Sequence, residues 1–226
     1  MSEKKKVEIQ KPVLSKNDRI AAQNRRRLEQ LGIYCINLIS SPGSGKTTLL
    51  ERLAGHFGPR MACIEGDLQT RRDAERVQRA GVLAHQIETD GACHLDAAEV
   101  AAALDVMDLG STEVELLVIE NVGNLVCPSS FELGEHMKVG MLSVPEGDDK
   151  VLKYPSIFSR VGVMIVNKID LLPYMDFDVE RAVEECRSIN SDVEVFRLAA
   201  KTGEHVEAFC RYLEEKQSAL TGSSRV

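Results

Sequence analysis

Long hydrophobic runs are missing from this chain of 226 residues. No run approaches the roughly 20 apolar residues that a membrane-spanning helix needs, so we expect no membrane partner. The opening Met-Ser-Glu-Lys-Lys-Lys also lacks the apolar stretch of a signal peptide. We therefore expect a cytoplasmic protein.

An excess of basic residues is missing too. The chain has 28 Lys and Arg against 35 Asp and Glu, which gives a net charge of −7. Broad nucleic-acid binding depends on neutralising phosphates, so we expect no nucleic-acid partner. No CxxC pair occurs among the six cysteines, and in the cytoplasm these would be mostly reduced. Four cysteines lie in apolar segments and are expected in the core: Cys35, Cys63, Cys186 and Cys210.

What the chain does have is a regular alternation of short apolar segments and helical ones from residue 33 onward. Strands are predicted at 33–39, 60–65, 82–87, 114–120, 136–144, 160–166 and 193–198. Helices are predicted at 46–57, 70–80, 95–107, 177–189 and 204–217. Strands rich in Val, Ile and Leu and separated by helices indicate an α/β fold, with a mostly parallel central sheet of about seven strands and helices on both faces.

The N-terminal region differs from the rest in composition. Residues 1–13 are basic and polar and are expected to form a flexible tail. Residues 15–31 form an Arg-rich helix, whose basic face is either simply solvated or a surface for a partner. Residues 14–226 are then expected to form a single domain, which is long enough for a large core.

The segment 36–50 has the pattern of a phosphate-binding P-loop. An apolar strand ends at Ile39, a Gly/Ser/Pro loop follows, and Gly45-Lys46-Thr47 opens a helix. Loop N–H groups and the helix dipole can surround phosphates. The expected nucleotide-binding residues are Gly43, Ser44, Gly45, Lys46, Thr47 and Thr48. Ser40 replaces the first glycine of the usual motif, and the alternative is an ordinary glycine-rich turn.

Two later loops predict that the base is guanine. Asn167-Lys168-Ile169-Asp170 follows a strand, and the Asp170 carboxylate can accept hydrogen bonds from N1–H and N2–H₂ of guanine. Asn167 is expected to bond the base and brace the loop, and the Lys168 stem to pack on the purine. The alternative for Asp170 is a helix cap. The last strand leads into Ala199-Ala200-Lys201, where a backbone N–H near Ala200 would meet guanine O6 and Lys201 would cover the base.

Candidates for Mg²⁺ binding and hydrolysis also follow strands. Glu120-Asn121-Val122-Gly123 occupies the place of a DxxG motif, with the Glu120 carboxylate near Mg²⁺ and the Gly123 N–H sensing the γ-phosphate. Asp67 is either a Mg²⁺ ligand or a helix cap, or both. We expect Thr47, Asp67 and Glu120 to hold Mg²⁺. Lys46, Asp67 and Glu120 are the expected catalytic residues, since no dedicated general base stands out.

Cys93, His94 and Cys127 fall in loops at the same predicted sheet edge. Thiolate and imidazole suit Zn²⁺, Ni²⁺ and Cu⁺. Three ligands are too few for a closed structural zinc site, although a second copy of the chain would complete the set. From spacing alone, metal ligands and ordinary cysteines both stay open.

These motifs resemble those of the HypB family of hydrogenase nickel-incorporation GTPases, in the SIMIBI class of P-loop proteins. The resemblance covers about residues 17–217. It rests on Ser-Ser-Pro-Gly-Ser-Gly-Lys-Thr-Thr, Glu-Gly-Asp-Leu-Gln-Thr, Cys-His-Leu-Asp-Ala, Glu-Asn-Val-Gly-Asn-Leu-Val-Cys-Pro, Phe-Glu-Leu-Gly-Glu, Leu-Lys-Tyr-Pro and Asn-Lys-Ile-Asp-Leu-Leu.

The resemblance implies a Mg²⁺-dependent GTPase that hydrolyses GTP to GDP and dimerises around nucleotide. Cys93, His94 and Cys127 match the family's nickel or zinc site at the dimer interface. The implied partners are a HypA-type accessory protein and the large subunit of nickel–iron hydrogenase. The alternatives are a GTPase chaperone of the urease-accessory or cobalamin-enzyme type, and a non-catalytic metal-binding adaptor controlled by nucleotide.

Two features of some family members are missing. Residues 1–34 contain no cysteine, so the CxxCGC nickel motif is absent from them, and the five histidines are scattered rather than gathered in a storage tract. We therefore expect any metal function to depend on Cys93, His94 and Cys127 alone.

Overall fold

The computed structural model describes residues 3–66, 81–88 and 93–223. Its centre is a seven-stranded sheet with the order β3-β2-β4-β1-β5-β6-β7, and every neighbouring pair of strands is parallel. The strands are β1 Tyr34–Ser40, β2 Met61–Glu65, β3 Leu83–Gln86, β4 Leu116–Glu120, β5 Met137–Ser143, β6 Val163–Asn167 and β7 Glu194–Leu198. All seven predicted strands are confirmed, with differences only at their ends.

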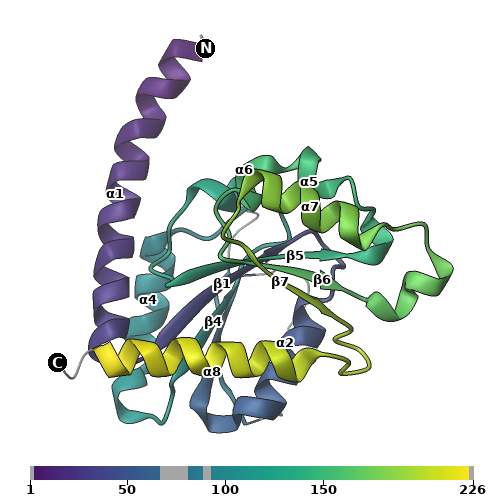
Figure 1. Cartoon of the computed structure of the whole chain (residues 1–226). Coiled ribbons are helices and arrows are strands. Elements are labelled where there is room, and N and C mark those ends of the chain that lie inside the picture. The colour runs from purple at the N-terminus through teal and green to yellow at the C-terminus, as the bar shows by residue number, and fades with distance from the viewer. Residues whose placement is uncertain (1–2, 67–80, 89–92, 224–226) are drawn as a thin grey trace.

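Helices cover both faces of this sheet (Figure 1). They are α1 Glu3–Gln30, α2 Lys46–Phe57, α4 Ala97–Met107, α5 Lys150–Lys153, α6 Pro155–Phe158, α7 Val179–Ile189 and α8 Val206–Ser223. The predicted α/β fold of the P-loop type is confirmed. The predicted helix 70–80 lies outside the described residues.

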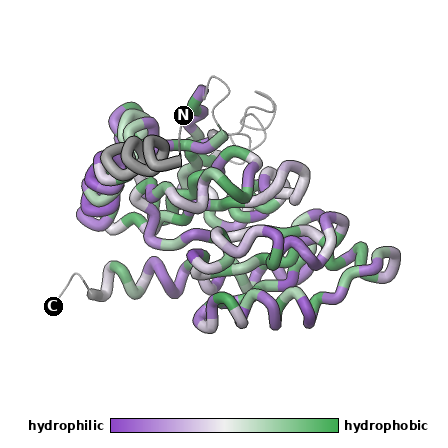
Figure 2. Tube along the Cα trace, turned by 90° about the horizontal axis from the view of Figure 1, so that it is seen from above, coloured by the Kyte–Doolittle hydropathy of each residue, from purple (hydrophilic) through white to green (hydrophobic). Residues whose placement is uncertain are grey.

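Alternation along the strands divides the core into layers. On β1, Ile36 and Leu38 pack with residues of α2 and α8 on one face. Cys35 packs with α1 and α4 on the other face, and Ile39 packs there with α6 and α7. This is the period of two that a strand buried on both sides requires. Apolar stretches accordingly gather in the middle of the molecule and polar ones along its outer helices (Figure 2).

The N-terminus differs from the prediction, because α1 begins at Glu3 rather than near residue 15. Residues 3–13 are thus helical rather than a tail, which fits their content of Lys, Glu and Gln, residues of good helix propensity. In Figure 1 this part of α1 projects away from the sheet. The domain boundary at residue 14 stays a prediction.

The C-terminal half of α1 is docked by polar contacts. Asn24 Nδ2 donates to the carbonyl oxygens of Ala97 and Leu133, at 2.8 and 2.9 Å. Arg25 and Arg27 bond Glu132 and Asp105 respectively. These two basic side chains therefore serve contacts within the chain. None of the helices in the described part of the chain is long and apolar enough to cross a membrane.

Candidate functional site

The three predicted nucleotide motifs meet in one pocket of about 290 Å³ at the carboxyl edge of the sheet. This is where a parallel sheet of this kind binds ligands. The pocket is lined by Gly45, Thr48, Asn167, Lys168, Asp170, Leu171, Ala200 and Lys201. The P-loop thus meets two loops that lie more than 100 residues later in the chain, after β6 and after β7.

The P-loop connects β1 to α2. Gly45 has φ +101°, a left-handed conformation open to glycine, and Lys46 begins the helix directly after it. Lys46 is buried, and its Nζ donates to the Ser40 hydroxyl at 3.2 Å. The serine in place of the first glycine therefore contacts the P-loop lysine. Strand, loop and helix are arranged as a phosphate-binding loop requires, with Thr47 and Thr48 in the first turn of α2.

Asn167 is the brace that the sequence predicted. Its Nδ2 donates to the Ser44 carbonyl at 2.8 Å, and its Oδ1 accepts the Ala200 N–H at 3.0 Å. Lys168 adds a second tie, since its Nζ donates to the Gly43 carbonyl at 2.7 Å. One buried amide therefore joins all three nucleotide loops. Because the N–H of Ala200 is used in this way, the N–H that meets guanine O6 is expected from a neighbouring residue.

Asp170 lies where its carboxylate could accept hydrogen bonds from a base in the pocket. Among the described atoms, its Oδ1 is buried and has no hydrogen-bond partner, and the residue lines the pocket. A buried acceptor without a donor is costly, and guanine would supply two donors there. Asp170 lies inside the 3₁₀ helix Ile169–Tyr174, whose N-cap is Lys168. The alternative of a helix-capping aspartate is therefore wrong.

Gly45→Ala is expected to disrupt this arrangement. A Cβ at residue 45 would lie 2.5 Å from Asn167 Nδ2, and the positive φ adds backbone strain. Together we expect a loss of about 1–3 kcal/mol in unfolding free energy and weaker GDP binding, measured by thermal unfolding and nucleotide titration. Gly55→Ala in α2 is the control, because no atom lies within 4 Å of its added Cβ. It should gain about 0.5–1 kcal/mol. Equal behaviour of the two variants would contradict the assignment of the brace.

A further contact to the P-loop was missed by the sequence reading. The Ser44 hydroxyl donates to Glu146 Oε2 at 2.8 Å, and the same oxygen accepts the N–H and hydroxyl of Ser143. Glu146 belongs to the polar segment 145–150. Its one sequence signal is the Ser143-x-x-Glu146 capping box at the end of β5.

The proposed Mg²⁺ and γ-phosphate residues lie close by. Glu120 ends β4, is buried, and stands in register with Glu65 at the end of β2. Gly123 packs against the P-loop, since a Cβ there would lie 3.1–3.3 Å from atoms of Pro42. Asp67 lies outside the described residues. Carboxylate and hydroxyl oxygens suit Mg²⁺, so Glu120 and Thr47 fit that ion chemically.

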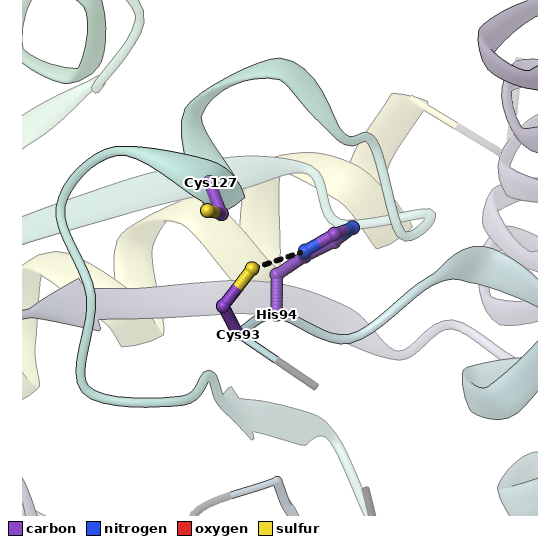
Figure 3. Close-up of side chains that lie close together, drawn as sticks. All are labelled: Cys93, His94 and Cys127. Carbon is purple, nitrogen blue, oxygen red and sulfur yellow. Dashed lines mark hydrogen bonds between the residues drawn. The ribbon is translucent and has the colours of Figure 1, made fainter. Parts of the chain in front are cut away.

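The side chains of Cys93, His94 and Cys127 converge on one point (Figure 3). Their ligand atoms all lie within 4.8 Å of one another, and Cys93 Sγ is 3.4 Å from His94 Nδ1. Cys127 comes from the short helix Cys127–Ser130, and the His94 ring lies 4.0 Å from that of Phe131. The other four cysteines are buried, as predicted. The sequence prediction of one cluster from two distant loops is thus matched by the geometry.

The local electrostatics favour the neutral forms of Cys93 and His94. The neighbouring Cys127 thiol is the main reason that the pKa of Cys93 is raised. Burial is the main reason that the pKa of His94 is lowered, against the opposing pull of Asp96 and Glu99. A neutral imidazole offers a lone pair to a metal. A cation bound here would displace thiol protons, as metals do at cysteine sites.

Comparison with known proteins gives a family. A family model described as "CobW/HypB/UreG, nucleotide-binding domain" matches residues 34–197, which include every described site residue except Ala200 and Lys201. The chain belongs to the CobW/HypB/UreG family. Two similar relatives are HypB proteins. The hydrogenase maturation factor HypB of Azotobacter vinelandii is 49% identical over 219 residues, covering 96% of this chain and 72% of that protein. The hydrogenase/urease maturation factor HypB of Helicobacter pylori (strain 26695) is 46% identical over 216 residues, covering 95% and 89%.

Solved structures of this family agree with the fold. HypB from Helicobacter pylori in complex with nickel superposes with a TM-score of 0.86 at 44% identity, covering 90% of this chain and 96% of that one. HypB from Archaeoglobus fulgidus gives 0.84 at 37% identity, covering 90% and 100%. The signal recognition particle receptor FtsY from Elizabethkingia anophelis, at 0.50 and 18% identity over 76% of this chain and 63% of that one, shares the fold alone.

Proposed function

We propose that this chain is a GTP-hydrolysing metallochaperone that binds nickel, or zinc in its place, and delivers nickel during maturation of nickel–iron hydrogenase. The observation that carries the proposal is the placement of Cys93, His94 and Cys127. Cys127 follows the same loop that packs against the P-loop at Gly123. The sequence similarity to hydrogenase maturation factors and to a HypB solved with nickel supports the choice of metal.

The nucleotide chemistry follows from the pocket. Asp170 would select guanine, and loop N–H groups with Lys46 would hold the phosphates. Mg²⁺ would be held by Thr47, Asp67 and Glu120 and would neutralise phosphate charge when bound with GTP. Lys46 is already inside the loop, held by Ser40. A preorganised cation of this kind stabilises charge that develops during hydrolysis.

Dimerisation is part of the proposal. Three ligands leave room for a group from a second chain. On the edge that carries the site, Val126 is 56% exposed beside Cys127, and Tyr174 is 81% exposed beyond the guanine loop. We propose that GTP brings two copies together there.

The partners proposed are a HypA-type accessory protein and the large subunit of the hydrogenase. The cytoplasm is the proposed location, where thiol ligands stay reduced. A second candidate function is maturation of urease. It is favoured by the Helicobacter pylori relative, which is named a hydrogenase/urease maturation factor. The two candidates share the GTPase and the metal site and differ in the receiving enzyme.

The test is a nickel and zinc titration with GDP and with a non-hydrolysable GTP analogue, with oligomeric state followed in parallel. We expect metal binding in both states, a different affinity in each, and a dimer with the analogue. Phosphate release from GTP with Mg²⁺ is measured on the same sample. Nucleotide binding without phosphate release above background would instead indicate a non-catalytic adaptor.

Lys46→Ala is expected to reduce GTP hydrolysis by about 100- to 1,000-fold, the usual cost of removing one preorganised group that stabilises the transition state. It should also abolish the nucleotide-dependent dimer seen by light scattering. Lys216→Ala on α8 is the control, because that exposed lysine lies over Tyr212 far from the pocket. A normal dimer and normal turnover in Lys46→Ala would refute the P-loop assignment.

A further inference from the structure

Asn121 holds two parts of the site together. It follows β4 directly and is buried. Its Oδ1 accepts the Val122 N–H at 3.0 Å and, across the loops, the Leu95 N–H at 3.3 Å. Its Nδ2 donates to Asn37 Oδ1 at 3.2 Å on β1. One amide thus connects the strand before the P-loop, the γ-phosphate loop and the loop that carries the metal ligands.

The orientation of this amide is fixed by a second one. Asn37 Nδ2 donates to Glu135 Oε1 at 3.2 Å, and a carboxylate oxygen can only accept. Asn37 must therefore present its Oδ1 to Asn121. Asn121 in turn must point its Nδ2 at Asn37 and its Oδ1 at the Leu95 N–H. Glu135 is itself buried, and its Oε1 lies 3.4 Å from Lys138 Nζ, so an ion pair holds this carboxylate in place.

Leu95 transmits this contact to two metal ligands. It is the residue after His94, and its side chain is fully buried. It packs so closely over Gly66 that a Cβ at residue 66 would lie 2.6 Å from it. Because the Leu95 N–H is bonded to Asn121, Cys93 and His94 are linked through the next residue of the chain to the γ-phosphate loop. A shift of Asn121 would therefore move both ligands.

The third ligand is attached to the same segment by a different residue. Asn124 Oδ1 accepts the N–H groups of Val126 and Cys127, at 2.8 and 3.4 Å. Between the two asparagines, Gly123 packs on Pro42 of the P-loop. Residues 121–124 thus contact the nucleotide loop at Gly123 and hold the metal ligands at two points, Leu95 through Asn121 and Cys127 through Asn124.

We propose that Asn121 is a positioning residue that makes the placement of Cys93 and His94, relative to Cys127, depend on the nucleotide in the P-loop. The inference deepens the proposed function and rests on it. A phosphate that shifts Gly123 moves Asn124 further than Asn121, which Asn37 holds to β1, and each asparagine carries its own ligands. The separation of the two ligand groups, and with it the metal affinity, then changes with nucleotide. Coupling of this kind between sites is typically worth a factor of about 5 to 150 in affinity.

The first test compares the Zn²⁺ dissociation constant with GDP and with a non-hydrolysable GTP analogue. In the wild-type chain the two constants should differ several-fold. In Asn121→Ala their ratio should fall to within about twofold of one, since coupling free energy is lost when the link is cut. Asn190→Ala is the matched control, because the Asn190 side-chain amide also makes two bonds to the backbone, donating from Nδ2 to the carbonyls of Phe158 and Val161, away from the nucleotide loops. It should keep the wild-type ratio.

A second test uses no metal. Iodoacetamide alkylation of Cys93 and Cys127 is followed by mass spectrometry with either nucleotide. Both rates should depend on nucleotide in the wild-type chain. In Asn121→Ala the Cys127 rate should still respond through Asn124, whereas the Cys93 rate should become independent of nucleotide. A purely structural role would not separate the two cysteines in this way. Asn121→Ser, which keeps a polar group in the buried space, replaces the alanine variant if that variant unfolds.

The outcomes separate the inference from the function on which it rests. A wild-type ratio preserved in Asn121→Ala, or a Cys93 rate that still follows the nucleotide, overturns the role of Asn121 alone. A wild-type chain that binds nucleotide and metal with no dependence of one on the other overturns the switch in the proposed function, and the inference with it.

Discussion

Asp170→Asn is expected to lower GTP affinity by about 100-fold to 10,000-fold. The carboxylate would accept two hydrogen bonds from guanine, and each hydrogen bond to a charged group is worth about 1.5–3 kcal/mol. The amide keeps one acceptor and places an N–H₂ against the guanine N2–H₂, where two donors face each other. Since about 1.4 kcal/mol is tenfold in affinity, losing both charged bonds gives the expected range. The buried Oδ1 that now has no partner among the described atoms is the reason to expect so large an effect.

The same variant should gain affinity for xanthosine triphosphate. Xanthine carries a carbonyl at C2, which accepts from the new amide, and it keeps the N1–H. Competition of both nucleotides against a fluorescent GDP analogue measures the exchange. Asp176→Asn is the matched control, because it makes the same change at an exposed aspartate of the next segment. Unchanged preference in Asp170→Asn would mean that the base is read elsewhere in the pocket.

The sheet was predictable because its signal is local. A strand buried on both faces needs a continuous run of apolar residues, and β1, β2, β4, β5 and β6 are buried at every position. The nucleotide loops were predictable for a related reason. Each follows such a strand, and parallel strands end at one edge. The meeting of Gly45, Asn167 and Ala200 therefore follows from the order of elements.

The contacts that connect the loops were not predictable in the same way. Glu146 reaches Ser44 and Asn121 reaches Leu95 across 102 and 26 residues of sequence. A polar residue in a loop looks the same in sequence whether it faces water or a buried partner. Asn167 was recognised as a brace because its motif is known to be one. Asn121, inside an equally distinctive string, gave no sign that its side chain is buried.

The start of α1 and the presence of very short helices could not be predicted from the sequence pattern either. The apolar stripe of α1 begins near Ile20, so the periodicity predicts a start near residue 15 rather than at Glu3. The first turns are rich in residues of good helix propensity, which show no apolar stripe. The short helices α5 and α6 were missed because four residues are too few to show a period. Cys93 and Cys127 were separated correctly from the four core cysteines, since they alone lie outside apolar segments.

Cys127→Ala is expected to weaken nickel and zinc binding by more than about 100-fold. Loss of a group that merely orients a ligand costs about 10- to 100-fold, so loss of a ligand should exceed that. Cys127 is half-buried, and its sulfur lies within 4.8 Å of the ligand atoms of Cys93 and His94. Without it two ligands remain, with no thiolate on the side of the γ-phosphate loop. Isothermal calorimetry should show lower affinity and fewer protons released, since one thiol fewer is deprotonated.

Cys186→Ala provides the control for this experiment. Cys186 is a fully buried cysteine of α7, packed in the core away from the cluster, and burial raises the pKa of its thiol to about 11. Its removal should lower the unfolding temperature and leave metal binding unchanged, because a protonated core thiol is no ligand. Cys127→Ala should do the opposite, with normal unfolding in the absence of metal. Equal metal affinity in the two variants would place Cys127 among the core cysteines and leave Cys93 and His94 without the partner that makes them a site.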